Sequence, residues 1–193
     1  MSNNPKIPRE LALQYANRFL KLIEPHVIKA EIAGSIRREQ KMVSDVEIVC
    51  LEDMENPLSN LFHKGFKGMI KNGDRYKQFN YPQVKIDLFI AQKHDYGRIL
   101  AIRTGSSAFS HLKLAKQWNR LGWAGCSDGL RRKKECEKTK SGKWILKEEY
   151  KDKPTLPPVF NTEYDFFDFL GIQWTEPRNR NWVSKNENIN YSV

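Results

Sequence analysis

Cysteine is scarce in this chain, and long apolar runs are missing from it. The three cysteines, Cys50, Cys126 and Cys136, form no paired disulfide framework, and so small and odd a number fits a reducing compartment. Their spacing, even together with His111, matches no common zinc site. No apolar stretch approaches membrane-spanning length, and the first residues lack the apolar core of a signal peptide. The sequence therefore predicts a cytoplasmic protein that does not enter a membrane.

Acidic residues are outnumbered, since the 193 residues include 33 Lys and Arg against 23 Asp and Glu and carry a net charge of +10. Such an excess suits a polyanionic partner, because each phosphate that a protein neutralises releases counterions. A basic protein without a nucleic-acid role has the same composition, so charge alone does not decide. Internal repeats are absent, and the length suits one domain or two small subdomains with a core of their own.

An apolar segment over residues 44–51 has the pattern of a strand that carries two carboxylates. Successive strand side chains point to opposite faces, so Asp45 and Glu47 share one face while Val46 and Ile48 share the other. Adjacent acids repel each other, so a cation must lie beside them or one acid must keep its proton. Hard oxygen ligands of this kind bind divalent metal ions. An Asp-x-Glu pair alone, however, more often lies on a solvated strand face.

A glycine–serine turn precedes that strand. Gly34 and Ser35 follow a predicted strand over residues 27–33 and begin a short predicted helix, whose free N–H groups suit the phosphates of a triphosphate. Arg38 would add a charged contact to the same phosphate oxygens. Arg37 could do so too, or it could pair with a surface acid instead.

A third acid, Asp87, lies in a further strand-like segment over residues 84–91. Three carboxylates beside a phosphate-binding turn suggest chemistry on a nucleoside triphosphate. The remaining periodicities predict helices over 8–24, 58–64, 96–103, 108–121 and 162–170, and strands over 66–70, 76–81 and 144–146. Strands and helices in this order, with acids on one side of a sheet, predict a small mixed α/β palm.

In their order along the chain, these motifs resemble those of family X DNA polymerases, the DNA polymerase beta type, within the nucleotidyltransferase superfamily. The matching segments are Gly34-Ser35-x-Arg37-Arg38, Asp45-x-Glu47, Ile86-Asp87-Leu88-Phe89, Arg103-Thr104-Gly105-Ser106 and residues 162–171, so the resemblance runs from about Leu11 to about Arg178. It implies an α/β (α+β) fold. A nucleotidyltransferase palm with a mixed β-sheet would occupy residues 1–93, and a small α+β C-terminal subdomain that binds nucleotide and DNA would occupy residues 94–193.

The resemblance also implies two-metal phosphoryl transfer with two Mg²⁺ ions, for which Mn²⁺ can substitute. Asp45 and Glu47 would bridge the ions. Asp87 would complete the catalytic metal site and accept the proton of the attacking 3′-hydroxyl. The implied nucleotide-binding residues are Gly34, Ser35, Arg38 and Ser44 at the phosphates, and Thr104, Gly105 and Ser106 at the sugar and base.

Contacts to DNA are expected from two basic groups in the C-terminal half. Lys113, Lys116 and Arg120 lie off the apolar stripe of the helix predicted over 108–121, and a basic run holds Arg131, Arg132, Lys133 and Lys134. A charge run is usually a solvated loop. Beside a polymerase-like core, we expect it to be an arm that contacts phosphates. The acids of the last helix, Glu163, Asp165 and Asp168, are expected on its surface.

The sequence departs from the family at several positions. Glu47 stands where DNA polymerase beta has Asp, and Lys85 stands where Arg is usual. Ile102 and Arg103 replace an aromatic pair that helps to reject ribonucleotides, which leaves the sugar selectivity open. We expect a member without the family's lyase domain, similar to minimal viral or phage members.

Three functions are compatible with these residues. The first is a monomeric, template-directed DNA polymerase that fills short gaps, acting on gapped or primer–template DNA with dNTP in DNA repair or viral replication, in the host cytoplasm if viral. The second is a nucleotidyltransferase that works without a template or on RNA, protein or a small molecule. The third is a non-catalytic nucleic-acid-binding module, against which the three intact acids argue.

Overall fold

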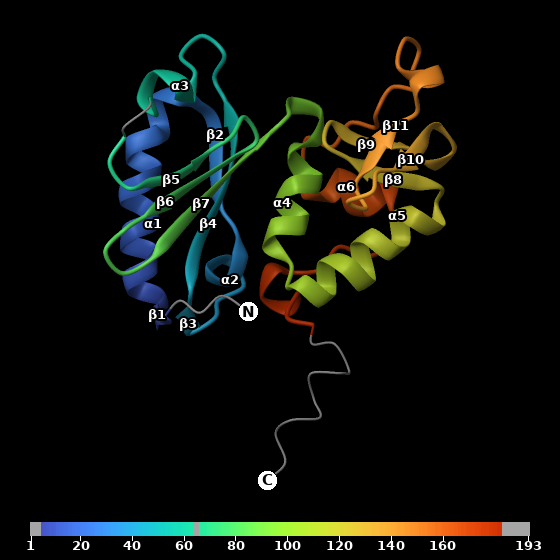
Figure 1. Cartoon of the computed structure of the whole chain (residues 1–193). Helices are drawn as coiled ribbons and strands as arrows, with labels where there is room; N and C mark the ends of the chain where they lie inside the picture. Colours follow the sequence, from blue (N-terminus) through green and yellow to red (C-terminus); the bar gives the residue numbers. More distant parts are fainter. Residues whose placement is uncertain (1–4, 64–65, 183–193) are drawn as a thin grey trace.

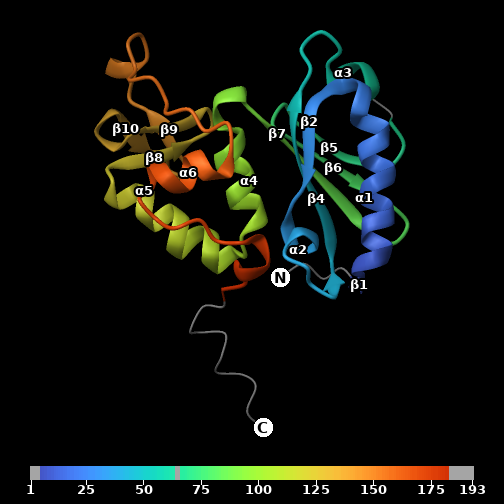
Figure 2. The ribbon, with the colours of Figure 1, turned by 180° about the vertical axis from the view of Figure 1, so that it is seen from behind.

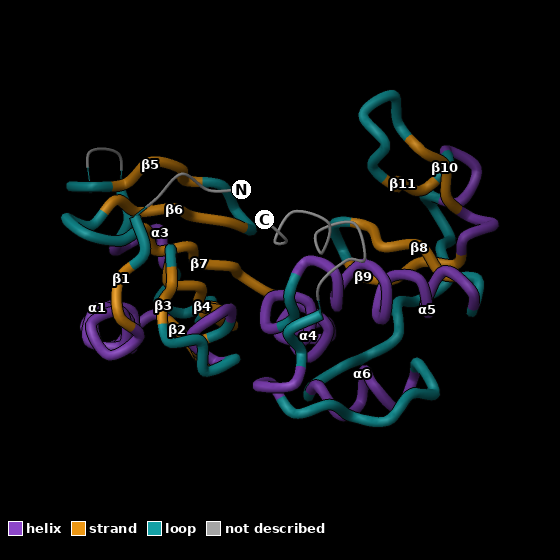
Figure 3. The backbone as a smooth tube through the Cα atoms, turned by 90° about the horizontal axis from the view of Figure 1, so that it is seen from below, coloured by secondary structure: helices purple, strands orange, loops and turns teal. Residues whose placement is uncertain are grey.

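The structure, a computed structural model, describes residues 5–63 and 66–182. It has two units side by side: a five-stranded sheet covered by a long helix, and a helical unit with small hairpins (Figures 1 and 2). Helix α4 (Tyr96–Thr104) lies at the boundary between them (Figure 3). Within the described ranges, no helix is both long enough and apolar enough to cross a membrane. The division into domains after residue 93 stays a prediction.

The sheet places the two acid-bearing strands next to each other. Its order is β2-β4-β7-β6-β5, in which β4 and β7 run parallel and the other neighbours are antiparallel. The strands are β2 (Val27–Ile32), β4 (Asp45–Glu52), β5 (Met69–Asn72), β6 (Tyr76–Asn80) and β7 (Lys85–Ala91). Parallel neighbours need a long crossover connection. Here α3 (Leu58–Leu61), β5 and β6 form it.

Helix α1 (Arg9–Ile23) covers one face of the sheet. Its buried residues recur at helical spacing and are Ala12, Ala16, Phe19 and Ile23. They pack in one cluster with Ile48 of β4 and Ile86 of β7. The opposite face of these strands meets α4 through Val49, Phe89 and Leu100. Because strand side chains alternate, the acids at 45, 47 and 87 lie on the α4 face.

The second unit packs around an aromatic cluster that includes Phe109, Trp118, Phe160 and Phe166. Its elements are α4, a π-helical stretch (Phe109–Ala115), α5 (Lys116–Arg120), β8 (Trp123–Cys126), β9 (Gly129–Arg132), β10 (Cys136–Lys138), β11 (Trp144–Leu146) and α6 (Glu163–Phe169). Strands β8 and β9 form one antiparallel pair, and β10 and β11 form another. Short elements complete the chain: β1 (Ile7–Pro8) paired with β3 (Met42–Val43), α2 (Gly34–Arg37), and 3-10 turns at Glu24–His26, Lys93–Asp95, Lys133–Glu135, Glu148–Tyr150 and Pro177–Asn179.

The predicted fold class is confirmed, because helices and a mixed sheet follow each other as the periodicity indicates. Three details differ. The strand predicted over 66–70 begins only at Met69, and the helix predicted over 108–121 is π-helical over its first part. Strands β8, β9 and β10 lie where no element was predicted. Residue 64 of the helix predicted over 58–64 lies outside the described residues, as does the tail after Trp182.

Candidate active site

The three predicted acids are brought to neighbouring positions by strand register. In the parallel pair β4–β7, Glu47 lies opposite Asp87, and Asp45 lies opposite Lys85. All three acids point to the face of the sheet that meets α4. The spatial prediction on which the site depends, that the third acid lies beside the first two, therefore agrees with the register of the sheet.

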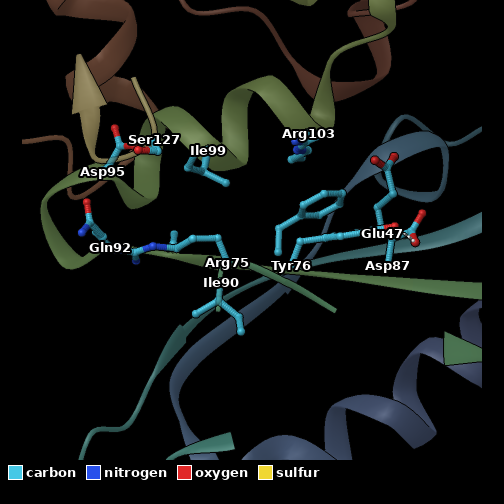
Figure 4. A pocket seen from close by; sticks show the side chains of 12 residues that line it. Glu47, Arg75, Tyr76, Asp87, Ile90, Gln92, Asp95, Ile99, Arg103 and Ser127 are labelled. Carbon is cyan, nitrogen blue, oxygen red and sulfur yellow. Dashed lines mark hydrogen bonds between the residues drawn. The ribbon is translucent and has the colours of Figure 1, made fainter. Parts of the chain in front are cut away.

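Each carboxylate nevertheless has its own surroundings. Tyr76 Oη donates to Asp87 Oδ1 at 2.7 Å, and Gln78 Nε2 donates to the same oxygen at 2.8 Å. The Glu47 side chain rises off the sheet, apart from the Asp87 carboxylate (Figure 4). In the described part of the chain, no three His, Cys, Asp or Glu side chains are gathered closely enough to hold a metal ion as they stand. A metal would have to draw the carboxylates together.

Gly34 makes room for the Glu47 carboxylate. Its φ of 61° is in the left-handed region that favours glycine, and a Cβ at this position would collide with Glu47 Oε2. The Ala33 amide donates to the Glu47 carbonyl at 2.8 Å, which ties the turn to β4. Ser35 is the second residue of α2, and its Oγ is buried without a hydrogen-bond partner among the described residues. A buried hydroxyl left without a partner is unfavourable, so this oxygen fits a ligand.

The two arginines of the turn have different partners. Arg38 donates from Nη1 to the Thr104 carbonyl at 2.8 Å and from Nε to Asn181 Oδ1 at 2.8 Å. Burial lowers the pKa of Arg38, while the charges of Glu47 and Asp45 act in the opposite direction. Arg38 thus lies near the acids while its guanidinium donates to Thr104 and Asn181, and its role as a phosphate ligand stays a prediction.

Arg37 points instead to the second unit. It donates from Nη1 to Thr104 Oγ1 at 2.7 Å and from Nη2 to Glu163 Oε2 at 2.8 Å. Arg180 donates to Glu163 Oε1 at 2.5 Å, and both Glu163 and Arg180 are buried. The prediction that Glu163 lies on the surface of its helix is therefore wrong. Arg37 Nη2 also lies 3.8 Å from Oε2 of Glu31, an acid with an exposed side chain. The alternative that Arg37 pairs with a surface acid is therefore confirmed, and the buried Glu163 is a second partner.

Burial and mutual repulsion raise the pKa values of the acids on β4. Burial raises the pKa of Glu47 to about 7, with a further contribution from Asp45, while Arg103 and Arg38 lower it. Burial and the charge of Asp87 likewise raise the pKa of Asp45, and a hydrogen bond from Ser44 opposes that shift. Ser44 therefore supports Asp45 directly, and its predicted contact with a phosphate is untested. A site with these properties favours an added positive charge.

The Thr104–Ser106 turn lies beside the Arg38 side chain. Gly105 and Ser106 line a cavity of about 480 Å³ together with Arg38 and Glu47. Ser106 Oγ donates to the Trp182 carbonyl at 2.8 Å. Thr104 is fully buried, and its oxygens bind the two arginines. The Thr104 side chain is thus occupied within the protein, and the prediction that the Thr104–Ser106 turn lines the sugar and base stays a prediction.

A second cavity, of about 570 Å³, is lined by Glu47 and Asp87 (Figure 4). Glu47 and Arg103 line both cavities, whereas Tyr76 and Asp87 line only the second. Sequence reasoning did not assign Tyr76 or Gln78 to the site, and it considered Arg103 only as a departure that affects sugar selectivity. Tyr76 and Gln78 are two residues apart on a predicted strand that neighbours the Asp87 strand, and this spacing was the available signal.

The basic residues predicted to contact DNA are not equivalent. Lys116 and Arg120 are exposed, while Lys113 is half-buried and donates to Thr175 Oγ1 at 2.8 Å. Arg131 is buried, with its guanidinium bound to Asp128 at 2.5 Å and to the Thr155 carbonyl at 2.7 Å. The prediction that Arg131 meets DNA is corrected accordingly.

The other three residues of that run are exposed and are Arg132, Lys133 and Lys134. They line a shallow groove with Leu121 and Gly122. Nearby, the buried thiols of Cys126 and Cys136 lie with their Sγ atoms 3.7 Å apart, and they form no metal cluster with other described residues.

No protein-family model matches this sequence, and no curated protein matches it. A solved structure that resembles it is that of Leishmania infantum polymerase beta in a ternary P/T complex. The two share 18% sequence identity at a TM-score of 0.67, over 93% of this chain and 78% of that one. The chain therefore has a polymerase beta-like fold, with a palm-type mixed sheet and helices.

Proposed function

We propose that this chain, with its polymerase beta-like fold, is a nucleotidyltransferase and, more specifically, a template-directed DNA polymerase of the family X type. It would add a deoxynucleotide to the 3′-hydroxyl of a primer, most simply in short gaps. The observation that carries the proposal is the register of β4 and β7, which sets Glu47 opposite Asp87 beside Arg38 and the unpartnered Ser35 hydroxyl. The proposed metal ligands and the proposed phosphate-binding groups thus lie next to one another.

The donor set fits divalent cations. Asp45, Glu47 and Asp87 offer hard carboxylate oxygens, and the raised pKa of Glu47 marks a site that favours added positive charge. When bound, two Mg²⁺ ions, or Mn²⁺ in their place, would stabilise the entering and leaving oxygens of the phosphoryl transfer. The carboxylates must lose their protons for this, so binding would compete with protonation of Glu47.

The residues of the chain then take distinct parts in the transfer. The 3′-oxygen of the acceptor forms a bond to the α-phosphorus, the bond from that phosphorus to the bridging oxygen breaks, and pyrophosphate leaves. Asp87 Oδ1 already accepts two hydrogen bonds, so we assign proton acceptance from the 3′-hydroxyl to Oδ2. Ser35 and Arg38 would hold the β- and γ-phosphates.

The proposed nucleic-acid partner is supported by charge and by likeness. The net charge of +10 suits a polyanion, and the similar solved polymerase was captured in a ternary P/T complex. Lys116, Arg120 and the exposed Arg132–Lys134 run are the candidate contacts to DNA phosphates. A monomeric state is part of the proposal.

A second candidate is a transferase that works without a template or on another acceptor. The feature that favours it is Arg103, which stands in the site where the resembling family has an aromatic residue that helps to select the sugar. A site that does not discriminate between correct and incorrect base pairs would allow untemplated addition. A site that does not discriminate between deoxyribose and ribose would allow the use of ribonucleotides.

Primer extension on gapped DNA, single-stranded DNA and RNA primers, each with dNTP or rNTP and with Mg²⁺ or Mn²⁺, tests these proposals. Incorporation that follows the template base supports the first candidate, and untemplated addition supports the second.

Asp87→Asn should reduce incorporation by at least about a thousandfold while DNA binding survives, because the site loses a metal ligand and the proton acceptor. Asp168→Asn makes the same change at an exposed position of α6 and should leave the rate unchanged. Near-full activity of Asp87→Asn would overturn the proposed site.

A further inference from the structure

Arg103 occupies a position between the two cavities that the proposed reaction does not explain. It lies in the last turn of α4, and its guanidinium carbon lies 3.9 Å from the centre of the Phe89 ring. Together with Glu47, it lines both the cavity beside Gly105 and the cavity beside Asp87. Figure 4 shows Arg103 directed into the space that Glu47 and Asp87 also face.

Arg103 is an exposed residue with negative charge nearby. Partial removal of its guanidinium from water lowers its pKa, and the charges of Glu47 and Asp87 raise it. Among the described residues, no carboxylate forms an ion pair with Arg103 within 4.0 Å, so stacking on Phe89 holds the guanidinium near the acids rather than in direct contact with them. A cation–π contact of this kind fixes an arginine without satisfying its charge.

We propose that Arg103 is the counter-charge of Glu47 and Asp87 in the metal-free protein, and that it weakens the binding of a divalent cation until an anionic nucleotide arrives. The inference rests on the proposed function in one respect, that these acids are metal ligands. A single positive charge within several ångströms stabilises the ionised carboxylates and repels an incoming dication. The negative charges of a triphosphate would cancel that repulsion, so cation and nucleotide would load together.

Arg103 acts through the carboxylates and is therefore a positioning residue. Removing its charge should strengthen the binding of a divalent cation in the absence of nucleotide. A variant that merely disrupts the structure of the site would weaken this binding instead. In a variant without the Arg103 charge, added nucleotide should also raise the cation affinity less than it does in the wild type. The repulsion between Arg103 and the cation, which the nucleotide would otherwise cancel, is already absent from that variant.

The experiment titrates the full chain with Mn²⁺ alone and measures free Mn²⁺ by electron paramagnetic resonance. It is run about one pH unit above the pKa of Glu47, so that protonation of Glu47 does not limit binding. The variants are Arg103→Gln, which removes the charge, and Arg103→Lys, which keeps it. Arg75→Gln is the matched control, because Arg75 lines the same cavity at the end beside Gln92 (Figure 4).

We expect Arg103→Gln to bind Mn²⁺ about threefold to tenfold more tightly than the wild type, the effect of removing one unit charge at this range from an exposed side chain. Arg103→Lys and Arg75→Gln should bind it as the wild type does. Added dCTP should tighten Mn²⁺ binding less in Arg103→Gln than in the wild type, after correction for Mn²⁺ bound to free dCTP.

The outcomes separate this inference from the proposed function. Equal Mn²⁺ affinity in the wild type and Arg103→Gln, with binding lost in Asp87→Asn, overturns the role of Arg103 and leaves the metal site standing. No binding in any variant overturns both. Equal tightening in Arg103→Gln and Arg103→Lys also overturns the inference, since the lysine keeps the charge. Circular dichroism of each variant confirms that the compared proteins are folded.

Discussion

Glu47 lies where burial and a neighbouring acid both oppose its negative charge, and its pKa rises to about 7 from the usual 4.5 of a glutamate. A carboxylate with a raised pKa binds more protons in the folded chain than in the unfolded one between these two values. The free energy of unfolding therefore falls as the pH rises through this range, and the contribution of Glu47 is lost above its folded pKa.

In metal-free buffer, the wild type should accordingly lose stability relative to Glu47→Gln between about pH 5 and about pH 8, by about 3 kcal/mol at most. The glutamine resembles the protonated acid and cannot titrate, so the difference between the two proteins isolates this one group. Urea unfolding at each pH measures the difference. A difference that stays constant over the range would show that Glu47 titrates normally.

Single residues also show what sequence reasoning could and could not find. Asp45, Glu47 and Asp87 were found because alternation along apolar strands fixes their face, whatever the rest of the fold does. Arg131 and Glu163 were assigned to the surface because most charged residues lie there. Their burial depends on partners that are distant in the sequence. These partners are Thr155 for Arg131, and Arg37 and Arg180 for Glu163. A local sequence pattern does not reveal such pairs.

At the scale of elements, helix α6 is joined to the turn at residues 34–38 by a buried ionic network. Glu163 at the start of α6 accepts from Arg37 of the turn and from Arg180 near the end of the described chain. Removing one partner from a buried network leaves the remaining charges without compensation, which costs more than an exposed ion pair contributes.

Glu163→Gln should therefore lower the free energy of unfolding by about 3 kcal/mol or more. Glu176→Gln removes the same charge from an exposed position in the same unit and should change it by less than about 0.5 kcal/mol. Urea denaturation of both variants measures the two effects. Similar small losses in both would mean that solvent screens the Glu163 network.

Periodicity explains which elements were predictable. Helix α1 and the strands β4 and β7 bury one face against a large core, and this burial leaves a clear pattern in the sequence. Strands β8, β9 and β10 have only three or four residues each and lie among lysines and glycines, so no pattern of useful length arises. Their pairing is decided by packing against Trp144 and Leu146 and by hairpin contacts rather than by alternation.

At the scale of the whole molecule, positive charge is concentrated in one segment. Residues 131–147 contain eight Lys and Arg and two Glu, an excess of six out of a net charge of +10. We call this segment the basic arm. An exposed surface of this charge binds a polyanion by releasing counterions, and such binding depends steeply on salt.

The double variant Lys133→Gln/Lys134→Gln should weaken binding to gapped DNA and reduce the slope of log affinity against log salt by about one for each lysine that contacts a phosphate. Lys21→Gln/Lys67→Gln removes the same charge from exposed positions on the sheet unit and should change the slope far less. Fluorescence anisotropy across a salt series measures both. Equal slopes for the two double variants would place the DNA contacts elsewhere than the basic arm.

The parallel pairing of β4 and β7 has a consequence for how the chain acquires its site. Glu47 and Asp87 are neighbours only because the crossover through α3, β5 and β6 returns the chain to the side of β4. No fragment that ends before β7 can assemble the three acids, however well its own helices and hairpins form. Competence for the proposed reaction would thus be a property of the completed sheet, and it would appear and disappear with cooperative folding of that sheet rather than by degrees.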